Sequence, residues 1–181
     1  AAYALILLNE AGVPCVFWGD LLGTPETGDL PAVRELPILM GVRFRAAIGP
    51  QHNAFDDPDV VGFAREGRAD VPGTGCAVIL SDRCAAEKTL SVGAHHAGEE
   101  WECLIGGHPP VRVADDGTLT GLVSDGGLSV YVPSLTGSGP RPRPLGEAVA
   151  ARAEKPRTRA GRPRVIGPAL RCCSYSAVPP R

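Results

Sequence analysis

Carboxylates are the side chains of this sequence with the widest chemical range, and several of them come in adjacent pairs. The pairs are Asp56-Asp57, Glu99-Glu100 and Asp115-Asp116. Acid–base hydrolysis needs two carboxyl groups that converge on one bond from separate positions, in environments that split their pKa values. Neighbours on a strand point to opposite faces, so these pairs cannot form such a site. The third pair is followed by glycine and predicts a turn.

Two single aspartates are better placed to bind a metal ion. Asp59 comes directly before an apolar run that predicts a strand, and Asp82 comes directly after another. Hard oxygen ligands at neighbouring strand ends, completed by backbone carbonyls, suit calcium. The alternative is that both aspartates only cap turns, which is the commoner use of aspartate there. His95-His96 lacks further ligands at a useful spacing, so this pair predicts a turn and not a metal site.

The triplet Trp18-Gly19-Asp20 ends the apolar run GVPCVFWGD. This run predicts a parallel strand over 13–18 that is buried on both faces, with a free buried thiol at Cys15. A strand that only fills a core needs neither an aromatic ring nor a carboxylate at its end. Trp18 and Asp20 are therefore candidates for ligand contact at the carboxyl end of a strand.

The elements around this triplet follow a helix–strand–helix order. Residues 1–11 have the apolar spacing of an amphipathic helix, and Leu36-Pro37 opens another after a long loop, because proline is tolerated in a first helical turn. This order is half of a βα repeat, either in an open doubly wound sheet or in one sector of a (β/α)8 barrel.

From residue 60 the pattern changes to short apolar runs separated by turn residues. The predicted strands cover 60–66, 76–82, 88–93, 99–105, 111–123 and 128–133, with turns such as Pro72-Gly73 and Asp116-Gly117 between them. Short strands in series without helices indicate an antiparallel β-sandwich of Greek-key type. In the strand over 99–105, Trp101 and Cys103 share the face that points to the core. We place a domain boundary near Pro50.

The charge of the chain is divided unequally. Residues 137–181 carry ten Lys or Arg against two Glu, whereas the rest of the 181-residue chain carries eight basic and eighteen acidic residues. The segment 134–181 is rich in Pro, Arg, Gly and Ala and predicts a disordered tail. Its basic charge could bind nucleic acid, but with Tyr175 as its one aromatic residue it lacks a stacking platform, and we expect no nucleic-acid partner. The apolar stretch at residues 3–8 is too short to cross a bilayer, and no membrane partner is expected.

Three stretches of the sequence together resemble one enzyme family. GVPCVFWGD is similar to a segment of the eighth barrel strand of α-amylases in glycoside hydrolase family 13. GPQHNAFDDPDVVGFAREG (49–67) and KTLSVGAHHAGEEWECLIGG (88–107) resemble the carboxyl-terminal β domain of the liquefying bacterial enzymes and their fungal relatives, and DGGLSVYV (125–132) follows in the same order. Leu22 departs from the family pattern, where tyrosine is expected.

The resemblance implies a fold and a set of site residues. Residues 1–49 would be the end of a TIM barrel, 50–133 the Greek-key β-sandwich, and Trp18 with Asp20 would face a glucan-binding cleft. Pro58, Asp59 and Asp82 would supply part of a calcium site whose other ligands lie in the barrel. The three catalytic carboxylates of the family would lie on strands that precede Ala1, so the chain alone is expected to be inactive.

The sequence therefore predicts a mainly β fragment of an α-amylase, whose parent hydrolyses internal α-1,4-glucosidic bonds of starch or glycogen. The alternative is a noncatalytic β-sandwich module that contributes stability or glucan contacts. A third interpretation is an interaction protein that works through its basic tail. We expect a monomer, while the compartment stays open between the cytoplasm and secretion.

Overall fold

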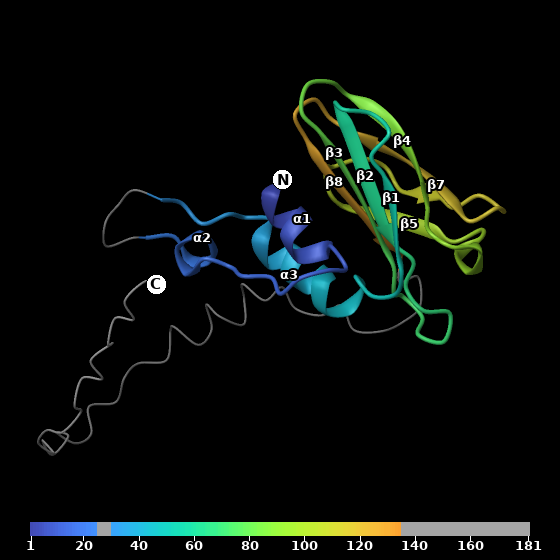
Figure 1. Cartoon of the computed structure of the whole chain (residues 1–181), viewed down its shortest axis with the longest axis horizontal. Coiled ribbons are helices and arrows are strands. Elements are labelled where there is room, and N and C mark those ends of the chain that lie inside the picture. Colours follow the sequence, from blue (N-terminus) through green and yellow to red (C-terminus); the bar gives the residue numbers. More distant parts are fainter. Residues whose placement is uncertain (25–29, 135–181) are drawn as a thin grey trace, which may run out of the picture.

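The computed structural model describes residues 1–24 and 30–134, in which helices precede a β-sandwich (Figure 1). The helices are α1 (Ala2–Leu8), α2 (Trp18–Leu22), α3 (Leu36–Arg45) and the short 3-10 helix η1 (Ala94–His96). None of the helices in this part has the length and hydropathy needed to cross a membrane. The disordered tail predicted from residue 134 onward lies outside the described residues, except for Ser134.

Eight strands form two antiparallel sheets in this part of the chain. The strands are β1 (Gln51–Ala54), β2 (Val60–Arg65), β3 (Cys76–Ser81), β4 (Ala86–Ser91), β5 (Glu100–Ile105), β6 (Val111–Arg112), β7 (Thr118–Val123) and β8 (Leu128–Pro133). One sheet has the order β1-β2-β3-β8-β5-β6, and β4 pairs with β7 in the other. The chain thus crosses between the sheets after β3, β4, β6 and β7, and the predicted mainly β sandwich is confirmed.

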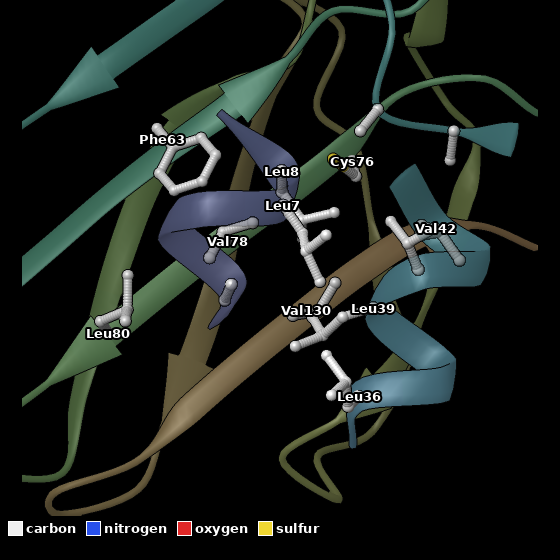
Figure 2. Packing of buried hydrophobic residues seen from close by; sticks show 14 residues of the cluster. Leu7, Leu8, Leu36, Leu39, Val42, Phe63, Cys76, Val78, Leu80 and Val130 are labelled. Atoms are coloured by element: carbon white, nitrogen blue, oxygen red, sulfur yellow. The ribbon is translucent and has the colours of Figure 1, made fainter. Parts of the chain in front are cut away.

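The six-stranded sheet is buried on both faces. Along β3, Cys76, Val78 and Leu80 point to the helices, whereas Ala77 and Ile79 point to the smaller sheet, as the two-residue period of a strand requires. The helix-side core has these buried members: Ala4, Leu7, Leu8, Leu36, Leu39, Val42, Ala46, Ala47, Phe63, Cys76, Val78, Leu80, Val130 and Val132 (Figure 2). The sandwich core has these: Val60, Ala64, Ala77, Ile79, Leu90, Val92, Trp101, Val113, Leu119, Val123 and Tyr131.

Two arginines attach the end of α1 to the rest of the molecule. The last carbonyl groups of a helix lack partners within the helix. Arg43 of α3 donates to the carbonyl oxygens of Leu7 (2.9 Å) and Asn9 (2.7 Å). The buried Arg65 at the end of β2 donates to the carbonyl oxygen of Leu8 at 3.4 Å and to that of Gly49 at 2.6 and 3.0 Å. These contacts fix the helices against the sheet in addition to the apolar packing.

The predicted buried strand over 13–18 is wrong for this structure. Residues 13–17 have no strand pairing, and Val13 and Phe17 are 91% and 60% exposed. A parallel strand buried on both faces needs neighbouring strands and covering helices. Among the described residues no strand pairs with this segment, and α1 contacts it through Tyr3, so it runs as an extended connection into α2.

Two smaller differences concern the sandwich. The polar strand β1 was not predicted, since the residues QHNA have no apolar alternation; it lies at a sheet edge and pairs only with β2. The run predicted over 111–123 is two strands, β6 and β7, separated by the turn at Asp116-Gly117. That turn was itself predicted.

Candidate functional site

Asp20 is held in place by a tyrosine from α1. The hydroxyl group of Tyr3 donates to Oδ2 of Asp20, and it accepts a hydrogen bond from the backbone N–H of Phe17 at 3.3 Å. The hydrogen bond to Asp20 is the main reason that the pKa of Tyr3 is raised. The backbone N–H of Val33 also donates to the carbonyl oxygen of Asp20 at 2.7 Å, so the loop after α2 returns to this point. A carboxylate oriented in this way can accept hydrogen bonds from hydroxyl groups.

Trp18 begins α2 and is 69% exposed. Figure 1 shows α2 on the far side of α3 from the sheet. Residues two apart on a helix do not face each other, so Trp18 and Asp20 share one short helix without converging on one point. An apolar hollow of about 580 Å³ lies between α1 and the segment before α2, lined by Ala2, Tyr3, Ile6, Cys15, Val16 and Phe17, and neither Trp18 nor Asp20 lines it. The exposed indole face of Trp18 suits contact with the flat face of a sugar ring.

The carboxylates that came in adjacent pairs have structural partners. Asp56 accepts from Lys88 Nζ at 2.6 Å, and this hydrogen bond lowers the pKa of Asp56. Asp57 accepts from the backbone N–H of Asp59 at 2.9 Å. Asp116 accepts from the backbone and hydroxyl groups of Thr118, which stabilises the predicted turn. Each of these three carboxylates is thus engaged by a neighbouring group of the sandwich or its loops.

A histidine cluster was not found by sequence reasoning. The predicted turn at His95-His96 is confirmed as η1, but His96 is only 3% exposed. Its Nδ1 lies 2.6 Å from Glu99 Oε2, and its Nε2 lies 2.8 Å from the carbonyl oxygen of Glu66. The ring also packs edge-on against Trp101, with centroids 5.1 Å apart. These contacts tie the η1 turn to the end of β2, and only the adjacency of two histidines hinted at them.

The expected calcium ligands do not form a complete site by themselves. Asp59 and Asp82 lie at adjacent strand ends, joined by a hydrogen bond from the backbone N–H of Asp82 to the carbonyl oxygen of Asp59 at 3.1 Å. The nearest charge between them belongs to Arg83, whose Nε lies 3.4 Å from Asp82 Oδ1 and 3.9 Å from Asp59 Oδ1. Calcium takes six to eight oxygen ligands. Within the described residues no group of three or more His, Cys, Asp or Glu side chains could hold a metal ion, and with Arg83 present these residues do not fit calcium.

Cysteines are the remaining nucleophiles, and the structure divides them by exposure. Cys76 is fully buried in the helix-side core, and burial raises the pKa of its thiol to about 12, against a smaller lowering by Arg65. Cys15 is exposed, contrary to the buried thiol predicted, because the segment around it is not a core strand. Cys84 is also exposed.

Thiol labelling should therefore separate the cysteines. We expect iodoacetamide at neutral pH to modify Cys15 and Cys84 in the native chain, and Cys76 only after unfolding, because the thiolate is the reactive species. Peptide mass spectrometry with and without urea measures each site. Native labelling of Cys76 at the rate of Cys84 would contradict the burial described above.

Comparison with known proteins identifies relatives over most of the chain. The chain is 36% identical over 137 residues to an α-amylase of Geobacillus stearothermophilus, an alignment that covers 75% of this chain and 25% of the relative. It is 36% identical over 142 residues to the cytoplasmic α-amylase of Escherichia coli, covering 72% and 28%. A solved α-amylase structure from Malbranchea cinnamomea shares the fold, with a TM-score of 0.54 at 16% identity over 76% of this chain and 33% of that one. No family model matches the chain.

These relatives, together with the sandwich and its covering helices, define the class: the chain is homologous to part of a glycoside hydrolase. The matched relatives are α-amylases, so the chain corresponds to a fragment of an α-amylase family protein, and it spans about a quarter of the length of the curated relatives that it matches.

Proposed function

We propose that this chain is a supporting part of an enzyme that hydrolyses internal α-1,4-glucosidic bonds in starch or glycogen. The observation that carries the proposal is the 36% identity to α-amylases over three quarters of the chain. A further relative, from Bacillus sp. (strain 707), is named a glucan 1,4-alpha-maltohexaosidase and is 35% identical over 133 residues. An α-1,4-glucan is accordingly the proposed substrate of the parent enzyme. We assign no catalytic step to a residue of this chain.

In this proposal the chain contributes stability and glucan contact. The division into a barrel end over 1–49, a sandwich over 50–133 and a tail over 134–181 is retained as part of the proposal. The helix-side core would join barrel and sandwich. Trp18 would stack on a sugar ring, and Asp20, oriented by Tyr3, would accept hydrogen bonds from sugar hydroxyl groups.

The purified chain should release no reducing ends from soluble starch above a heat-inactivated sample. Retaining hydrolysis needs two carboxyl groups about 5–5.5 Å apart across the bond, and inverting hydrolysis needs them about 6.5–9.5 Å apart. Asp20, the carboxylate proposed to contact glucan, is instead bonded to Tyr3. A reducing-sugar assay measures this directly. Hydrolysis by the chain itself would contradict the proposed supporting role.

A chimera tests the same proposal in the positive direction. The matching quarter of the Geobacillus stearothermophilus α-amylase is replaced by residues 1–134 of this chain, and starch hydrolysis is measured. We expect the chimera to be active, and Trp18→Ala in it to raise KM. Phe44→Ala, which removes an aromatic ring that is 87% exposed on α3, is the matched control and should leave KM unchanged. A folded but inactive chimera would count against the proposal.

A noncatalytic glucan-binding module is the second candidate, favoured by the exposed indole of Trp18. Native electrophoresis of the chain in gels with and without glycogen tests whether the chain binds glucan by itself, outside a parent enzyme. Retardation by glycogen that is lost in Trp18→Ala, without hydrolysis, would support the module. Mobility that is independent of glycogen would exclude the glucan-binding module and retain only the supporting role.

The proposed partners, oligomeric state and compartment apply to a full-length parent enzyme. Such a parent would bind α-glucan and work as a monomer without nucleic acid or membrane, in either the cytoplasm or the extracellular space. For Pro58, Asp59 and Asp82 to take part in a calcium site there, the parent would have to supply further ligands from outside this chain and also displace Arg83 from the two carboxylates.

A further inference from the structure

Arg83 stands at the one point of the described sandwich where calcium was expected. Its Nε lies 3.4 Å from both carboxylate oxygens of Asp82 and 3.9 Å from Oδ1 of Asp59. Asp59 ends the loop before β2, and Asp82 and Arg83 directly follow β3. A single guanidinium group therefore faces both carboxylates at the shared end of these two strands.

The charges explain why this arrangement competes with a metal ion. Two carboxylates alone would leave two negative charges side by side, which attracts a divalent cation. The guanidinium group cannot be deprotonated in a protein and removes one of these charges at every working pH. Calcium would have to displace Arg83 or share its carboxylates, in a place where the three side chains are 50–76% exposed and can move.

Two other oxygen atoms at this point already accept hydrogen bonds. The carbonyl oxygen of Asp59 accepts from the backbone N–H of Asp82 at 3.1 Å. Oδ1 of Asp57 accepts from the backbone N–H groups of Asp59 and Val60 at 2.9 and 3.3 Å. The strand ends are thus already joined by hydrogen bonds, and a metal ion is not needed to connect them.

We propose that Arg83 is an internal counter-charge for Asp59 and Asp82, which takes the place of calcium and makes the end of strands β2 and β3 independent of it. The role of Arg83 is measured by the calcium dependence of stability, whereas the proposed function is measured by starch hydrolysis. A negative result in one measurement therefore does not affect the other.

The test compares the full chain with Arg83→Gln by thermal denaturation in about 5 mM calcium chloride and in EDTA, the calcium level being chosen for a weak site. We expect the Tm of the unsubstituted chain to be the same in both. Arg83→Gln should have a lower Tm in EDTA and regain a few degrees in calcium, since its two carboxylates are then unneutralised. Amide NMR shifts of Asp59 and Asp82 in a calcium titration should locate the effect.

Two further variants make the test specific. Arg68→Gln removes another exposed arginine, which pairs with Asp70 alone at 2.6 Å, and should create no calcium response. Adding Asp59→Asn and Asp82→Asn to Arg83→Gln should abolish the response. Stabilisation of the unsubstituted chain by submillimolar calcium would overturn the inference. So would an Arg83→Gln chain that calcium at about 10 mM leaves unchanged, a level above the weak-site range.

Discussion

Gly49→Ala should destabilise the chain by about 3 kcal/mol or more, a large part of the roughly 5–15 kcal/mol that stabilises an ordinary domain. Gly49 connects α3 to β1 and has φ of +80°. A Cβ atom at this position would lie 2.1 Å from the carbonyl oxygen of Gly67, in the loop that follows β2. Both groups are backbone and cannot rotate away. The approach is also fixed, because the N–H of Gly67 donates to the carbonyl oxygen of Ile48 at 2.9 Å.

Gly107→Ala is the matched control for this prediction. Gly107 has a similar φ of +70°, but a Cβ atom there meets nothing within 4 Å. Only the cost of a left-handed backbone conformation remains, about 1–2 kcal/mol. Urea denaturation followed by circular dichroism gives both free energies of unfolding. Equal losses in the two variants would mean that the contact between Gly49 and Gly67 is not a determinant of stability.

Trp101→Ala is the second large effect, with an expected loss of about 3–5 kcal/mol. Trp101 is fully buried in the sandwich core, and its Nε1 donates to Glu99 Oε2 at 3.3 Å. Removal of the indole leaves a cavity between the sheets, and it also removes the ring that packs against His96. The rigid surrounding strands cannot collapse into this space.

Trp18→Ala removes the same side chain from an exposed position and serves as the comparison. Trp18 is the only other tryptophan of the chain, so each variant retains one indole for fluorescence. Its loss should change the free energy of unfolding by no more than about 0.5 kcal/mol, as for most surface substitutions. If the two variants lost equal stability in urea, the burial assigned to Trp101 would be contradicted.

The strands of the sandwich were predictable because their apolar sequence pattern agrees with their burial in the fold. The uninterrupted apolar run CAVILS was predicted as a strand, and β3 indeed lies between two cores. The same rule failed for residues 13–18, since the neighbouring strands that would bury such a run are not among the described residues. An apolar run shows that a segment is suited to burial. It does not show whether the neighbouring elements that would bury the segment are present.

The candidate sites were predictable as residues but not as geometry. The sequence located Asp59 and Asp82 at strand ends, which the structure shows to be adjacent. It did not indicate that Arg83 turns back onto both carboxylates, because the direction of a long side chain depends on the turn that carries it. The hydrogen bond between Tyr3 and Asp20 was not predicted either, because it joins residues that are seventeen positions apart in the sequence.

The burial of the six-stranded sheet on both faces determines where the molecule can be divided. A shortened chain that begins at residue 50 would retain every strand and would still uncover Phe63, Val78, Leu80 and Val130, which pack against α1 and α3 (Figure 2). A continuous apolar surface of this kind promotes self-association. The unit to exchange between related enzymes is therefore the sandwich together with α1 and α3. The sequence, in contrast, predicts a domain boundary near Pro50, between these helices and the sandwich.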